Sequence, residues 1–123
     1  MPLVTLEVAD TVPPATRLAY ADAVHRGLVE GLHLDAGDRF CVIHPLPEDH
    51  LIADRHYLGG ERRHPLYVRV QATHGWGVAD KEAAFQAIAR NLQAEGVRPD
   101  DVFVVITDNH VGDWYPGARG TKG

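Results

Sequence analysis

The feature that most constrains this chain is a repeat within it. Identical residues recur 63 positions apart in its two halves. The matched pairs are Pro2 and Pro65, Asp38 and Asp101, Phe40 and Phe103, Val42 and Val105, and Ile43 and Ile106. Each half carries a β-rich segment, an amphipathic segment and a second β-rich segment. The repeat therefore predicts two fused βαβ units, over about residues 1–47 and 64–110.

Hydrophobic periodicity places the elements within each half. Alternating and β-branched segments predict strands over residues 2–8, 39–44, 64–72 and 101–107. Apolar residues three and four apart predict helices over 15–32 and 79–95, and we expect Gly96 to cap the second. We expect Pro45 and Pro47 to end the second strand. Because strands joined by a helix run parallel, the predicted fold class is α/β (α+β): a four-stranded sheet with both helices on one face.

Length and composition limit what the chain can be. Its 123 residues suffice for one domain, and a formal net charge of -5 argues against a surface that follows nucleic-acid phosphates. No apolar stretch is long enough to span a membrane, and the first residues lack the pattern of a signal peptide. Cys41 is the single cysteine, so no intramolecular disulfide forms. We expect a soluble, cytoplasmic domain that binds neither nucleic acid nor membrane.

The fourth strand indicates an oligomer. Residues 102–106 are apolar at every position, which is typical of a strand covered on both faces. Helices on one side of the sheet cover only one of these faces. We therefore expect the other face to meet further copies of the chain, since symmetric association buries an apolar surface.

The start of the chain points to a family. A proline directly after Met1, opening a strand in a duplicated βαβ unit, resembles the tautomerase superfamily. Residues 38–40, 54–59, 96–103 and the Trp-containing 112–117 resemble its malonate semialdehyde decarboxylase-like branch. The resemblance covers essentially the whole chain. It implies a single tautomerase-like domain over residues 1–123, a homotrimer of fused chains, and Pro2 in a pocket at the subunit boundary.

Pro2 is the residue on which a catalytic role depends. Removal of Met1 makes Pro2 a secondary amine held by a rigid ring, and an ordinary α-amino group titrates near ~8. Burial and neighbouring positive charge lower the pKa of such an amine, so that it accepts a proton near neutral pH. Pro65 is an internal amide and cannot do this. If Met1 is retained, Pro2 has no basic nitrogen and simply opens a strand.

The resemblance also assigns pocket roles to other residues. It implies that Asp38 orients or activates water or substrate; the alternative is a turn aspartate. His74 and Trp76 occupy the positions at which decarboxylases of this branch carry two arginines that hold the substrate carboxylate. We predict that both bind substrate, with Trp114 as a pocket wall. The alternatives are a loop histidine, a turn aromatic and packing against a neighbouring subunit.

Metal ions and cofactors are not expected. Four histidines, at positions 44, 50, 56 and 64, lie in or beside the connector between the halves. Their spacing matches no zinc motif and no cysteine pair accompanies them, so we interpret them as solvated loop histidines. Arg39 and Arg119 are the candidates for a cation that replaces the missing arginines.

These residues support one leading function and two alternatives. The leading function is a tautomerase in which Pro2 moves a proton between the enol oxygen and the α-carbon of a small carbonyl acid. An aryl-pyruvate enol is the first substrate to consider. The second is a hydratase or decarboxylase of the malonate semialdehyde decarboxylase type, which the absent arginines disfavour. The third is a non-catalytic trimeric binding protein, which follows if Met1 is retained.

Overall fold

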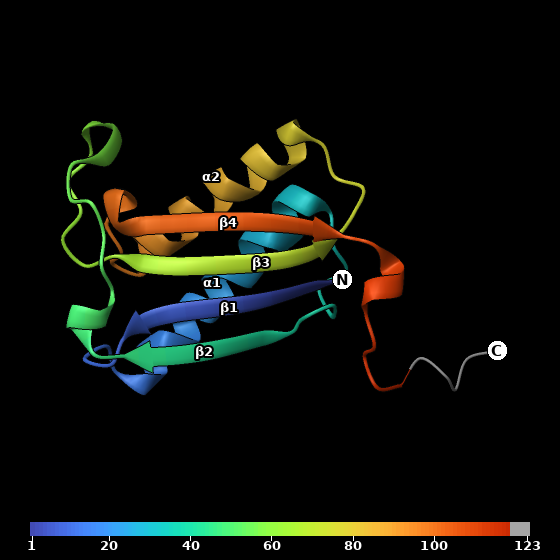
Figure 1. Ribbon diagram of the computed structural model, residues 1–123, viewed down its shortest axis with the longest axis horizontal. Coiled ribbons are helices and arrows are strands. Elements are labelled where there is room, and N and C mark those ends of the chain that lie inside the picture. Colours follow the sequence, from blue (N-terminus) through green and yellow to red (C-terminus); the bar gives the residue numbers. More distant parts are fainter. Residues whose placement is uncertain (119–123) are drawn as a thin grey trace.

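The computed structural model describes residues 1–118. Its long elements follow one another as β1 (Pro2–Ala9), α1 (Pro14–Leu32), β2 (Cys41–Leu46), β3 (Leu66–Thr73), α2 (Val78–Ala94) and β4 (Val102–Asn109). The described strands form a sheet of order β2-β1-β3-β4. β1 is parallel to β2, β3 is parallel to β4, and β1 is antiparallel to β3. Both helices lie behind this sheet in Figure 1, so the predicted fold class is confirmed.

This topology gives the sheet two equivalent ends. Pro2, at the start of β1, lies opposite Ala72, near the end of β3. The starts of β1 and β2 and the last residues of β3 and β4 therefore share one end, which we call the Pro2 end. It lies on the right in Figure 1, beside the label N. At the opposite end, the Pro65 end, β1 and β2 finish and β3 and β4 begin, and the connector 47–65 crosses between the halves.

The core lies between the sheet and the two helices. Alternate residues of the central strands face it and are buried: Val4, Leu6 and Val8 in β1, and Leu66, Val68 and Val70 in β3. α1 approaches α2 closely because glycines stand at the contact. A Cβ atom on Gly31 would lie 2.3 Å from the Ala84 backbone, and one on Gly27 would lie 2.6 Å from Ile88 Cγ1. Neither helix of the described chain is long and apolar enough to cross a membrane.

β2 extends further than the sequence predicts because it is an edge strand. It continues through Pro45 to Leu46. The Val4 amide donates to Phe40 O at 3.0 Å and the Asp10 amide donates to Leu46 O at 2.7 Å, so even-numbered residues of this segment bond to β1. The backbone nitrogen of Pro45 therefore points away from β1, toward the open edge of the sheet. Because an amide there would make no bond to β1, the missing N–H of proline costs the strand no hydrogen bond. The prediction that the strand ends at Pro45 is wrong, but the strand does end directly before Pro47.

The face of the sheet turned away from the helices carries exposed apolar side chains. Phe103 and Val105 of β4 are 47% and 41% exposed, and the Phe103 ring centroid lies 5.4 Å from that of Tyr67. In the middle of this face Arg69 Nε pairs with Glu7 Oε1 at 3.0 Å. The face thus combines an apolar edge with a polar centre, and its burial in an oligomer stays a prediction.

Candidate active site

Pro2 and Asp38 lie together at the Pro2 end. Pro2 opens β1 and is buried. Asp38 Oδ2 lies 3.4 Å from the amino nitrogen of Met1, and Thr73 Oγ1 lies 3.5 Å from the same nitrogen. The Asp38 amide donates to Asp35 O at 2.9 Å, which fixes the turn before β2. The structure therefore places a carboxylate beside the first nitrogen of the chain; with Met1 present, the Pro2 nitrogen is an amide.

The space beside Pro2 is small in the single chain. The cavity lined by Pro2 and Asp38 measures about 10 Å³, roughly the room that one water molecule needs. Cys41 lines the same cavity, and burial raises the pKa of its thiol while the charge of Arg39 opposes the rise. A substrate therefore needs more room than this arrangement supplies.

A second polar group at the Pro2 end is not predicted by the sequence. Asp108, near the end of β4, accepts a hydrogen bond from Lys81 Nζ at 3.0 Å, and its Oδ2 lies 3.7 Å from His74 Nδ1. Its other oxygen, Oδ1, is buried and has no hydrogen-bond partner among residues 1–118. Ala72 is the strand neighbour of both Pro2 and Asp108. One strand with a small side chain therefore separates the proline from this carboxylate.

Two nitrogen-bearing side chains, Lys81 and His74, lie beside Asp108 near the predicted site. Lys81 stands near the start of α2, the helix that follows the loop carrying His74. The exposed His74 ring also lies 6.0 Å from the His110 ring, measured between centroids. An ammonium and an imidazole N–H both donate hydrogen bonds to carboxylates. The arrangement is thus able to receive the acid group of a ligand.

The two tryptophans have partners within the fold. Trp76 packs against the core, and its Nε1–H donates to Leu32 O, the last residue of α1, at 2.8 Å. Trp114 follows the short helical turn η4 (Val111–Asp113) and donates from Nε1 to Asn109 Oδ1. These contacts give both indoles a part in packing. Substrate binding by Trp76 and Trp114 stays a prediction.

Metal ligation finds no support in the described chain. Within residues 1–118 no three His, Cys, Asp or Glu side chains are grouped so that they could hold an ion. The connector histidine His64 instead pairs through Nδ1 with Glu48 Oε1 at 2.5 Å. Of the two candidate replacement cations, Arg39 is held in an ion pair with Asp22 at 3.1 Å, and Arg119 lies outside the described residues.

Comparison with known proteins assigns the chain to a family. The family model described as tautomerase enzyme matches residues 38–115. The probable tautomerase YrdN of Bacillus subtilis (strain 168) is 26% identical over 118 residues, which cover 95% of this chain and 92% of the relative. The chain belongs to the tautomerase superfamily, as the resemblance predicts.

Solved structures agree with this assignment. The crystal structure of FG41 malonate semialdehyde decarboxylase inhibited by 3-bromopropiolate matches with a TM-score of 0.89 and 34% identity, covering 94% of this chain and 88% of that one. A fused 4-OT wild-type symmetric trimer matches with a TM-score of 0.78 and 20% identity, covering 94% and 92%. The second likeness shows the fold alone.

Proposed function

We propose that this protein is a tautomerase whose Pro2 amine, freed by removal of Met1, is the general base in the keto–enol isomerisation of a small carbonyl acid. Membership of the tautomerase superfamily supports the class of reaction. The observation that carries the assignment is that Asp38 and the buried Pro2 line the same cavity at the start of β1. A carboxylate in this position holds an amine or a substrate hydroxyl by a charge-assisted hydrogen bond.

In the proposed reaction the Pro2 nitrogen removes the proton from the enol oxygen. The electron pair of that O–H bond forms the π bond of the carbonyl. The electron pair of the enol C=C bond then takes the proton from the protonated Pro2 and forms the new C–H bond at the α-carbon, which returns the nitrogen to its neutral state. The nitrogen must start unprotonated, and a buried position favours this because desolvation disfavours a charged amine. The rigid ring fixes the direction of the lone pair, and Asp38 orients the substrate hydroxyl.

The acid group of the substrate is proposed to bind beside Lys81 and His74. Lys81 Nζ lies 3.0 Å from Asp108 Oδ2, so the carboxylate offsets part of the positive charge of Lys81. This part of the site is therefore less positive than one built from two arginines, each of which binds a carboxylate through two parallel N–H groups. Such a side suits a substrate with one carboxylate and a large apolar body. An aryl-pyruvate enol is therefore the first substrate to test.

A decarboxylase or hydratase of the malonate semialdehyde decarboxylase type is the second candidate. The 34% identity to FG41 malonate semialdehyde decarboxylase, over 94% of this chain, favours it. Against it, His74 and Trp76 replace the expected arginines, and the Trp76 N–H is already bound to Leu32 O. Carbon dioxide release from malonate semialdehyde tests this candidate. Retention of Met1 would favour the third, a non-catalytic binding protein.

We also propose that the protein is a homotrimer, acts in the cytoplasm as a single domain, and works without a metal or cofactor. The exposed Val42, Phe103 and Val105 on the open face support assembly, because symmetric contacts would bury them. The net charge of -5 argues against nucleic acid as a partner. Light scattering on the purified protein measures the oligomeric state.

Conversion of an aryl-pyruvate enol to its ketone, followed by absorbance, tests the proposed base. We expect Pro2→Ala to lower kcat/KM about 100-fold or more. Pro65→Ala is the matched control, because Pro65 occupies the equivalent position in the repeat but is an internal amide, and it should retain the wild-type rate. Equal rates in wild type and Pro2→Ala would contradict the proposal.

A further inference from the structure

The repeat places a counterpart of the Pro2 site at the other end of the sheet. His64, Pro65 and Asp101 stand 63 positions after Met1, Pro2 and Asp38. The geometry matches as well. Asp101 Oδ1 lies 3.2 Å from the backbone nitrogen of His64, and Asp38 Oδ2 lies 3.4 Å from the amino nitrogen of Met1. The Pro65 end differs in one respect: a cavity of about 250 Å³ opens beside these residues.

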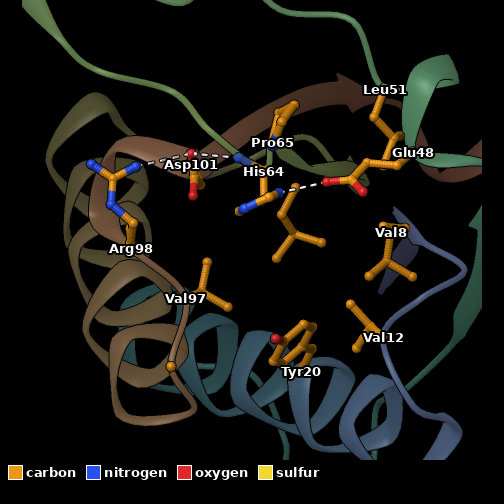
Figure 2. A pocket seen from close by; sticks show the side chains of 13 residues that line it. Val8, Val12, Tyr20, Glu48, Leu51, His64, Pro65, Val97, Arg98 and Asp101 are labelled. Atoms are coloured by element: carbon orange, nitrogen blue, oxygen red, sulfur yellow. Dashed lines mark hydrogen bonds and ion pairs between the residues drawn. The ribbon is translucent and has the colours of Figure 1, made fainter.

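The repeat gives the Pro65 end no counterpart of Trp76. At the Pro2 end, Trp76 packs on the core beside the last residue of α1. The residue 63 positions earlier is Pro13, so no indole stands at the equivalent position of the first half. The walls are apolar and come from strands, helices and the connector: Val8, Val12, Tyr20, Leu51, Leu66 and Val97. Figure 2 shows Val8, Val12, Tyr20 and Val97 around a common space.

The polar groups at this cavity offer mainly acceptors. His64 Nδ1 and Glu48 Oε1 lie 2.5 Å apart, on one side of the space in Figure 2. In the tautomer that donates from Nδ1 to Glu48, the His64 Nε2 is an acceptor. Asp101 is 3% exposed and already accepts bonds from backbone amides. Arg98 donates to Asp101 at 3.5 Å and to Glu61 O at 2.8 Å. A ligand group therefore binds here best as a donor.

Carboxylates outnumber cations at the cavity, since Glu48 and Asp101 line it beside one arginine, Arg98, which is bound to Asp101 and Glu61 O. Burial raises the pKa of the Tyr20 hydroxyl, and the charge of Glu95 raises it further. Glu95 itself does not line the cavity, whereas Glu48 does. A carboxylate ligand would lose its hydration in an apolar space that faces these charges. The cavity thus disfavours the acids that the Pro2 end is proposed to take.

We propose that the cavity at the Pro65 end binds a neutral monocyclic aromatic compound with one O–H or N–H donor, a phenol or an aniline. An apolar cavity of about 150 Å³ holds benzene, so the larger space here accepts a ring with one or two small substituents. The ring packs on the apolar walls and the donor reaches His64 Nε2 or Glu48. Because Pro65 is an internal amide, the site holds its ligand without reaction.

Titration of the full-length protein with 4-methylphenol, followed by ¹H–¹⁵N NMR and calorimetry, tests the proposal. We expect saturable shifts at amides around Val8, His64 and Val97. The charged 4-methylbenzoate, of similar size, should bind about tenfold more weakly. Val12→Trp places a ring in the cavity and should weaken 4-methylphenol binding about tenfold. Pro2→Ala should leave that affinity unchanged, which separates this site from the proposed catalytic one.

A second variant covers the case in which Val12→Trp does not fold, as judged by its thermal transition. Glu48→Gln removes a charge at the lining and should reduce the preference for the phenol over the benzoate about threefold. Shifts centred on Thr73 and Asp108, equal affinity for the two compounds, or the absence of saturable shifts would overturn the proposal.

Discussion

The two ends of the sheet hold equivalent aspartates with different partners. At the Pro2 end, Asp38 faces the amino nitrogen of Met1. At the Pro65 end, Asp101 accepts hydrogen bonds from the Arg63 and His64 backbone amides and lies 3.5 Å from the Arg98 guanidinium. The backbone around the two aspartates is similar because the two halves of the chain are repeats of one βαβ unit. The nitrogen that Asp38 faces is a terminal amine and the one that Asp101 faces is a peptide amide. The comparison shows that backbone amides saturate Asp101, whereas the Asp38 side chain faces the terminal amine. The chemical role of Asp38 belongs to the proposed function.

Charge separates the two ends as well. At the Pro2 end Arg39 opposes the rise that burial causes in the pKa of Cys41. At the Pro65 end Glu95 adds to the rise that burial causes in the pKa of Tyr20. Lys81, paired with Asp108, lies near Pro2, and Glu48 and Arg98 line the cavity near Pro65. The two proposals assign acids to the first end and neutral donors to the second.

Trp76→Ala should have the largest effect, because it makes the Pro2 end resemble the Pro65 end. The change removes a ring packed on the core and its bond to Leu32 O, and we expect the free energy of unfolding to fall by about 3 kcal/mol. Trp76→Phe keeps a ring and loses the bond, so it should cost about 1 kcal/mol. Urea unfolding measures both. Equal losses of unfolding free energy in Trp76→Ala and Trp76→Phe would mean that the Trp76 ring fills no space in the core.

The two aspartates should separate stability from activity. Asp101→Asn replaces a buried carboxylate whose oxygens accept several hydrogen bonds, so those bonds lose their charge. We expect the free energy of unfolding to fall by about 2 kcal/mol. Asp38→Asn should change it by no more than about 0.5 kcal/mol and lower kcat/KM about tenfold. Urea unfolding and the enol-to-ketone assay measure the pair. A stability loss in Asp38→Asn as large as that in Asp101→Asn would remove the distinction between the ends.

Glu95→Gln should lower the pKa of Tyr20. The Glu95 charge disfavours the tyrosinate, so its removal lets Tyr20 ionise at lower pH, while burial keeps the pKa of the hydroxyl above its ordinary value. Alkaline titration of ¹³C-labelled tyrosine rings by NMR follows this residue separately. Glu82→Gln, elsewhere on α2, is the control and should leave the Tyr20 titration in place.

Arg39→Gln should have the smallest effect, and it should raise the pKa of Cys41 where Glu95→Gln lowers the pKa of Tyr20. Loss of the Arg39 charge leaves burial unopposed and raises the pKa of Cys41 further, so less thiolate is present at a given pH. Labelling of Cys41 by iodoacetamide should slow about twofold. Arg26→Gln removes the other arginine that pairs with Asp22 and serves as the control. Faster labelling in Arg39→Gln would contradict the positive character assigned to this end.

The fold could be predicted from the sequence because its signals are local. Strands and helices follow from periodicity, and parallel pairing follows from the order βαβ. The error at Pro45 has a topological cause, since a proline inside a strand is tolerated where the strand lies at a sheet edge. No local pattern shows that β2 is such a strand.

The site could be predicted only in part. Pro2 and Asp38 follow from the repeat and the resemblance, but the Lys81–Asp108 bond joins residues 27 positions apart that meet only through the packing of α2 against the sheet. Trp76 is predicted to bind substrate from its position alone. Its bond to Leu32, 44 positions away, is a tertiary contact that no spacing in the sequence announces.

The mass of the N-terminal peptide, determined on the same sample as the enol-to-ketone rate, tests the role of Pro2 most directly. We predict that the active protein lacks Met1 and begins with a free Pro2, and that inserting an alanine between Met1 and Pro2 abolishes the activity while the fold survives. Full activity in protein whose Pro2 nitrogen is acylated by a preceding residue would contradict the proposed base.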